Sequence, residues 1–72
     1  MKTAQIAETV RQRRQKLGLT QLELADLAEV SERLVRDIEA GRATIRTDKL
    51  LATLDALGLE LRIIRTHSEN GR

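Results

Sequence analysis

The sequence contains no cysteine, no proline and no phenylalanine, tyrosine or tryptophan. Without cysteine the chain has no disulfide and no thiolate ligand, and the single histidine, His67, cannot form a zinc site alone, so we expect no metal and no cofactor. The missing aromatic residues argue against a β-sandwich or barrel. No apolar run of about 18 residues and no signal-peptide pattern is present, so we expect a cytoplasmic protein without a membrane segment.

What is present suits one small helical domain. The 72 residues are 40% hydrophobic and 33% charged, and 13 Lys plus Arg against 11 Asp plus Glu give a formal charge of +2. A domain of this size buries only about 60% of its unfolded surface, so helix packing or oligomerisation has to stabilise it. We predict one domain over residues 1–65 and a disordered tail over 66–72. No nucleophile and base can be assembled around His67, so we expect no enzymatic activity.

Apolar residues recur at helical spacing in four segments, which predicts helices over residues 3–17, 20–28, 31–40 and 47–57. Thr20 and Glu23 form a capping box at the start of the second helix, and Ser31 and Thr47 are the expected N-caps of the third and fourth. The residues predicted to face the core are Ile6, Val10, Leu17, Leu24, Ala25, Ala28, Leu34, Val35, Ile38, Leu50, Leu51, Leu54 and Leu57, with Leu22 and Leu27 left open.

Only about three residues separate the second and third helices, so the pair forms a tight helix-turn-helix. Residues 59–63 alternate apolar and polar side chains, which predicts a β-strand. The chain offers no second strand, and a lone strand leaves its N–H and C=O groups without partners. We therefore predict an all-α fold whose short C-terminal strand pairs with its copy in a homodimer, through Leu59, Leu61 and Ile63.

One charged residue falls on the apolar side of the first helix. Arg14 lies four residues after Val10, and a buried guanidinium without a partner is costly. Glu39, four residues after Val35, is the carboxylate that can reach it. We predict a structural ion pair between Arg14 and Glu39.

The outward face of the third helix is charged. If Leu34 packs inward, this face carries Glu32, Arg33, Arg36 and Asp37. From spacing alone, such a face is a solvated surface with intrahelical ion pairs such as Arg33 with Asp37. Spacing does not decide whether Leu34 faces the core or an external ligand.

Residues 6–57 resemble the helix-turn-helix of the phage-repressor superfamily, of the Xre and Cro type. The resemblance rests on the runs Leu19-Thr20-Gln21-x-Glu23-Leu24-Ala25, Val30-Ser31, Val35 and Ile38-Glu39-x-Gly41. This superfamily inserts the N-terminal half of its third helix into the DNA major groove. The resemblance implies that Arg33 and Arg36 read bases and that Gln21 contacts a phosphate. The complete DNA-contacting set that we predict is Thr20, Gln21, Ser31, Glu32, Arg33, Arg36, Asp37, Arg42 and Arg46.

The later run Thr47-x-x-Leu50-Leu51-x-x-Leu54-x-Ala56-Leu57-Gly58-Leu59-Glu60-Leu61 resembles the narrower group of HipB-like antitoxins. This resemblance implies an autoregulatory repressor that also binds a HipA-like toxin kinase. A homodimer suits a palindromic operator whose half-sites lie about one or two helical turns apart. Two alternatives stay open: a plain repressor without a toxin, and a protein-binding inhibitor whose DNA binding is vestigial.

The chain departs from the phage-repressor pattern at one position of the turn. Glu29 stands where the superfamily usually has glycine. If this position requires a positive φ, glutamate costs about 1 kcal/mol relative to glycine.

Overall fold

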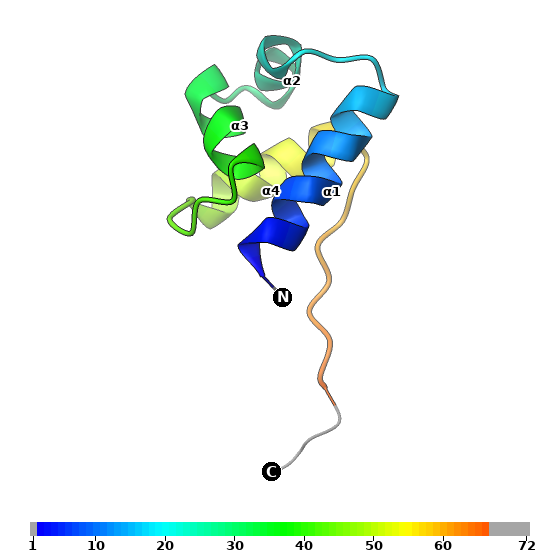
Figure 1. Ribbon diagram of the computed structural model, residues 1–72, viewed down its shortest axis with the longest axis vertical. Coiled ribbons are helices and arrows are strands. Elements are labelled where there is room, and N and C mark those ends of the chain that lie inside the picture. The colour runs from blue at the N-terminus through cyan, green and yellow to red at the C-terminus, as the bar shows by residue number, and fades with distance from the viewer. Residues whose placement is uncertain (1, 67–72) are drawn as a thin grey trace.

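The computed structural model describes residues 2–66 and contains four helices (Figure 1). They are α1 (Thr3–Lys16), α2 (Gln21–Ala28), α3 (Glu32–Glu39) and α4 (Thr47–Ala56). The main helix contacts are α2 with α3, α1 with α3, and α2 with α4. The predicted all-α fold of four helices is therefore confirmed, and each helix ends within two residues of its predicted bounds.

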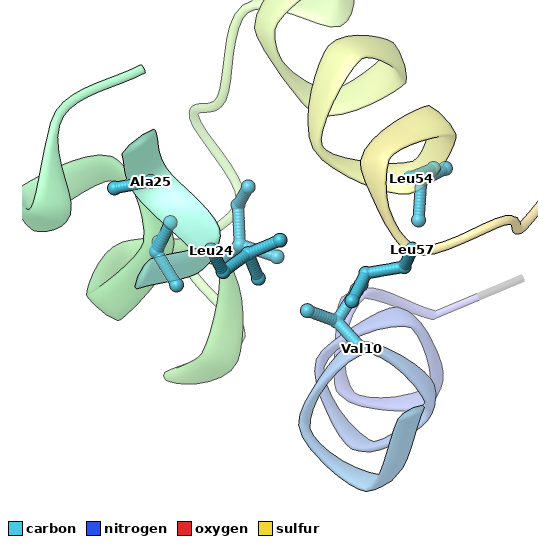
Figure 2. Packing of buried hydrophobic residues seen from close by; sticks show 7 residues of the cluster. Val10, Leu24, Ala25, Leu54 and Leu57 are labelled. Carbon is cyan, nitrogen blue, oxygen red and sulfur yellow. The ribbon is translucent and has the colours of Figure 1, made fainter. Parts of the chain in front are cut away.

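The hydrophobic core lies where all four helices meet. Figure 2 shows Leu24 of α2 pointing toward Val10 of α1 and Leu57, the residue that follows α4. These three side chains are fully buried, as is Val35 of α3. The residues of the buried core cluster are Val10, Leu24, Ala25, Val35, Ile38, Leu54 and Leu57. All seven were predicted from the helical spacing.

The structure corrects two of the predicted core positions and decides three that were open. Leu17 and Leu51 are exposed, because Leu17 lies beyond the last turn of α1 and Leu51 lies on the outer side of α4. Leu22 and Leu27 are also exposed. Leu34 is half-buried and packs against the core cluster, so it faces inward.

Side-chain caps fix the start of the second and third helices. The Thr20 hydroxyl accepts a hydrogen bond from the Glu23 N–H at 3.0 Å, and the Glu23 carboxylate accepts one from the Thr20 N–H at 2.8 Å. The Ser31 hydroxyl accepts from the Leu34 N–H at 3.0 Å. The prediction for the fourth helix was wrong by one residue: Arg46 is the N-cap of α4, without a side-chain cap bond.

The turn between α2 and α3 places Glu29 in the left-handed region, with φ of 59° and ψ of 44°. It is the one residue other than glycine with positive φ in the part of the chain that the structure describes. A β-carbon in this region is crowded by the following carbonyl oxygen. The turn therefore keeps the backbone that glycine favours, at a cost in stability.

The C-terminal segment, residues 59–66, has no regular secondary structure, so the predicted strand is not formed within a single chain. The Leu59 N–H donates to the Leu54 carbonyl, and from Glu60 to Thr66 the described residues make no backbone hydrogen bond with one another or with the helices. A strand needs a second strand to complete its ladder, and residues 2–66 supply none. The predicted tail, from residue 67 onward, lies outside the described residues.

We expect Glu29→Gly to raise the melting temperature, because glycine adopts positive φ without steric cost. The gain should be about 1 kcal/mol, or roughly 4–8 °C for a domain of this size. Thermal unfolding followed by circular dichroism measures it.

Gly18→Ala is the matched control. Gly18 has φ of 73°, and a β-carbon there would meet nothing within 4 Å, so its only effect is on the backbone. It should lower the melting temperature by a similar amount. A Glu29→Gly protein that melts at or below the temperature of the parent would show that the left-handed turn carries no strain.

Candidate nucleic-acid interface

A buried carboxylate, Glu39 at the end of α3, joins three parts of the fold. Its side chain is 4% exposed and accepts two hydrogen bonds from Arg14 of α1, from Nε at 2.6 Å and from Nη2 at 3.0 Å. The Gln21 amide, at the start of α2, donates to the same carboxylate at 3.1 Å. Arg14 Nη1 also donates to the Leu19 carbonyl at 2.9 Å. The expected pair of Arg14 with Glu39 is thus present, as part of a larger network.

This network is charged and largely shielded from water. The Arg14 side chain is 13% exposed. Its hydrogen bond with Glu39 raises the pKa of Arg14 above its usual value, against the opposing effect of burial. A bidentate arginine–carboxylate contact has a fixed geometry, so it orients α1 and α3 relative to each other. Removing one partner would leave the other buried without a counter-charge.

A polar groove opens beside this network. It is lined by Arg11, Arg14, Gln21, Arg36, Asp37, Glu39, Ala40 and Arg42. Four of these residues, Gln21, Arg36, Asp37 and Arg42, belong to the predicted DNA-contacting set, and the fold brings them together from the start of α2, from α3 and from the loop after it.

Arg11 is a member of the groove that the sequence did not single out. Its Nη1 donates to the Glu39 carbonyl at 3.3 Å, and its guanidinium also pairs with Glu8 one turn earlier on α1. In sequence it looks like one of several solvated basic residues. Its position three residues before Arg14, on the side that faces α3, is the signal that could have identified it.

The ion pairs on the outward face of α3 differ from the pair that the spacing predicts. Arg33 does not pair with Asp37. Instead, Arg36 Nη1 lies 3.2 Å from Glu32 Oε2, and Arg42 Nε lies 3.9 Å from Asp37 Oδ1. Among residues 2–66, no ion pair involves Arg33, and its side chain is exposed. The first turn of α3 therefore presents a guanidinium directly to solvent.

The other predicted contacts are spread around this face. Arg42 and Arg46 both lie in the segment between α3 and α4 and are exposed, and Arg46 pairs with Asp48 at 2.8 Å. The hydroxyls of Thr20 and Ser31 already cap α2 and α3. A hydroxyl that accepts a cap bond still has its own O–H to donate.

The arrangement is chemically suited to DNA. Arginine can donate two hydrogen bonds to guanine, and a carboxylate can accept one from cytosine. The N-terminal end of a helix attracts phosphate, and Gln21 is the first residue of α2. Among the described residues, no cluster of acidic or histidine side chains could hold a metal ion, and no helix is long and apolar enough to cross a membrane.

Two short helices joined by a three-residue turn, with basic residues on the outer side of the second, define a helix-turn-helix DNA-binding domain. The helix-turn-helix family model HTH_3 matches residues 10–64, which is more than half of the chain. The protein therefore belongs to this family of DNA-binding transcription regulators. No curated protein matches the chain.

We expect Arg14 and Glu39 to be strongly coupled in stability. Arg14→Leu and Glu39→Leu should each cost about 3 to 5 kcal/mol, because each leaves one buried charge without its partner. The double variant should lose less than the sum of the two. Urea unfolding of the four proteins gives the coupling energy, and Glu39→Gln, which keeps the shape and removes the charge, covers the case in which a leucine variant does not fold.

The pair Arg46 and Asp48 is the matched control, since both side chains are largely exposed. Its coupling should be about 0.5 kcal/mol or less. If Arg14 and Glu39 couple no more strongly than this surface pair, the network does not hold the helices together.

Proposed function

We propose that the protein is a sequence-specific repressor that binds a palindromic operator as a homodimer and regulates its own operon. The main support is the first turn of α3, where Arg33 is exposed and forms no ion pair with a carboxylate among residues 2–66. In a helix-turn-helix domain this turn enters the major groove. Arg33 and Arg36 then donate hydrogen bonds to base edges. Glu32 and Asp37 select between bases or orient the two arginines.

Phosphate contacts flank this reading turn. Gln21 has one N–H bonded to Glu39, which leaves its second N–H available for a phosphate oxygen. Arg42 and Arg46 add charge on the loop, and Thr20 and Ser31 add hydroxyl donors at two helix starts. A net charge of only +2 is sufficient, since DNA binding depends on the local potential of one face.

The homodimer is proposed from the C-terminal segment. Ile63 is 96% exposed and Ile64 is also exposed, on a segment whose backbone has no described partner beyond Leu59. An exposed apolar strand edge on so small a domain favours pairing with another chain. Figure 1 shows this segment leaving the domain past α1, away from α2 and α3, so pairing there leaves the α3 face open.

The antitoxin role is proposed on the resemblance of residues 47–61 to HipB-like proteins alone. In this reading a HipA-like toxin kinase docks on the side of the dimer away from DNA. Co-purification from the native host, together with the adjacent reading frame, tests it. A kinase-like neighbour that co-purifies and is less toxic in the presence of this protein supports the antitoxin; an unrelated neighbour and a pull-down that returns only DNA favour the plain repressor.

We expect Arg33→Ala and Arg36→Ala each to cost about 1 to 3 kcal/mol on the operator and to relax the preference at one base position. Gln21→Ala should weaken binding to all sequences alike, because a phosphate contact carries no base information. Selection from a randomised DNA pool by each variant measures both effects.

Arg13→Ala is the control for general loss of positive charge, because the Arg13 Nε donates to the Leu57 carbonyl, away from the polar groove. It should leave base preference unchanged. If the two α3 arginines lose specific and random DNA binding equally, they contact phosphates and not bases.

We expect Ile63→Asp to weaken the dimer and, through lost bivalency, to weaken operator binding by at least tenfold. Sedimentation and operator titration measure the two effects. Ile64→Asp is the matched control, an equal change at the neighbouring exposed isoleucine, whose side chain would lie on the opposite face of a strand, and it should disturb the dimer less. A stable dimer with unchanged affinity in the Ile63→Asp protein would overturn the strand interface.

A further inference from the structure

The four arginines that line the polar groove are all paired with carboxylates of the same chain. Arg14 is held by the buried Glu39. The three exposed pairs are Arg11 with Glu8, Arg36 with Glu32 and Arg42 with Asp37. These carboxylates balance the arginines, so the groove has little net charge to attract a phosphate. A DNA backbone that enters it has to compete with the carboxylates of the exposed pairs.

One exposed pair lies on α1, outside the predicted DNA-contacting set. Arg11 Nη1 donates to the Glu39 carbonyl at 3.3 Å, which holds the guanidinium at the groove. Its Nη2 donates to Oε1 of Glu8, whose side chain is exposed. Among residues 2–66, neither Arg36 nor Arg42 has a comparable hydrogen bond to the backbone. Arg11 can therefore exchange its carboxylate for another anion and still keep its place.

Glu8 is itself held at the edge of the groove. Its Oε2 accepts a hydrogen bond from Gln12 Nε2 at 2.8 Å, so both carboxylate oxygens have donors. Ala4 lies against Gly41, since a β-carbon on that glycine would be 3.9 Å from the Ala4 α-carbon. Arg11 also contacts the end of α3. Side chains three and four residues apart share one face of a helix, so Glu8 lies on the side of α1 that faces the end of α3.

We propose that Glu8 is a built-in competitor of DNA phosphate for Arg11. In the free protein its carboxylate occupies the side of the guanidinium that a phosphate oxygen takes in the DNA complex. Carboxylate and phosphate accept the same charge-assisted hydrogen bonds from arginine, so they exclude each other at these donors. This inference rests on the proposed DNA binding, and it adds one phosphate-contacting residue and the group that opposes it.

The competition weakens binding to DNA of every sequence alike, because a phosphate contact carries no base information. The coupling of an exposed ion pair corresponds to a factor of up to about five in an equilibrium constant. The exchange also changes the salt dependence. Each phosphate charge that the protein neutralises steepens the fall of log affinity with log salt by about 0.9. With Glu8 present, the phosphate that Arg11 gains is offset by the carboxylate that it releases.

Glu8→Gln tests the competition, because glutamine keeps the length of the side chain and removes its charge. The affinity of the full-length protein for a short duplex of random sequence is measured by fluorescence anisotropy across a series of NaCl concentrations. Glu8→Gln should tighten binding about two- to fivefold and steepen the salt dependence by about 0.9. The same factor should appear on DNA from upstream of the gene.

Arg11→Gln separates the competition from a general loss of negative charge. In a protein that carries Arg11→Gln, the further change Glu8→Gln should leave the affinity and its salt dependence nearly unchanged. Asp55→Asn is the matched control, because Asp55 is exposed, lies outside the polar groove and has no ion pair among residues 2–66. It removes the same charge and should leave binding nearly unchanged. The comparison of Glu8→Gln with Asp55→Asn decides the inference even where loss of Arg11 unfolds the domain, which circular dichroism detects.

The outcomes separate this inference from the proposed function. A gain that needs Arg11 and exceeds that of Asp55→Asn supports the competition, even where no variant prefers the upstream DNA, in which case the repressor proposal alone fails. A Glu8→Gln protein that binds the upstream DNA selectively but no more tightly than the parent overturns the competition and leaves the repressor intact. An equal gain in Glu8→Gln and Asp55→Asn, or with and without Arg11, is an effect of net charge and also overturns it. Absence of DNA binding in every variant overturns both.

Discussion

The fold depends on one buried carboxylate. Glu39 ends α3, and through its contacts with Arg14 and Gln21 it ties that helix to α1 and to the start of α2. No aromatic side chain and no disulfide contributes to this small core. A directional ionic contact is well suited to fix helix orientation, because apolar packing alone tolerates rearrangement. The same contact holds Gln21 beside the polar groove, so stability and the candidate DNA face share one residue.

Much of this could be predicted from residue spacing. Capping residues and glycines marked the helix ends, and the apolar period identified the buried core, including Val10, Leu24 and Leu57. The charge of Arg14 on an apolar side was itself the signal for a buried partner. These features are local, or they concern a single pair, and local rules determine them.

Features that depend on three-dimensional neighbours could not be predicted. Spacing paired Arg33 with Asp37, but Arg42 approaches Asp37 from the following loop, and only the path of that loop decides this. The place of Arg11 beside the groove depends on how α1 crosses α3. Residues 59–63 alternate apolar and polar side chains, but the strand predicted from that pattern is not formed, because a strand needs hydrogen-bond partners that the described residues do not supply.

We propose that this helix-turn-helix domain recognises one DNA sequence through α3. The most direct measurement is the affinity of the purified protein for DNA upstream of its own gene and for a shuffled version, across a series of salt concentrations. We expect a preference of at least about a thousandfold for the natural sequence and an affinity that falls steeply with salt. Equal affinity for the two DNAs, or no binding at low salt, would contradict it.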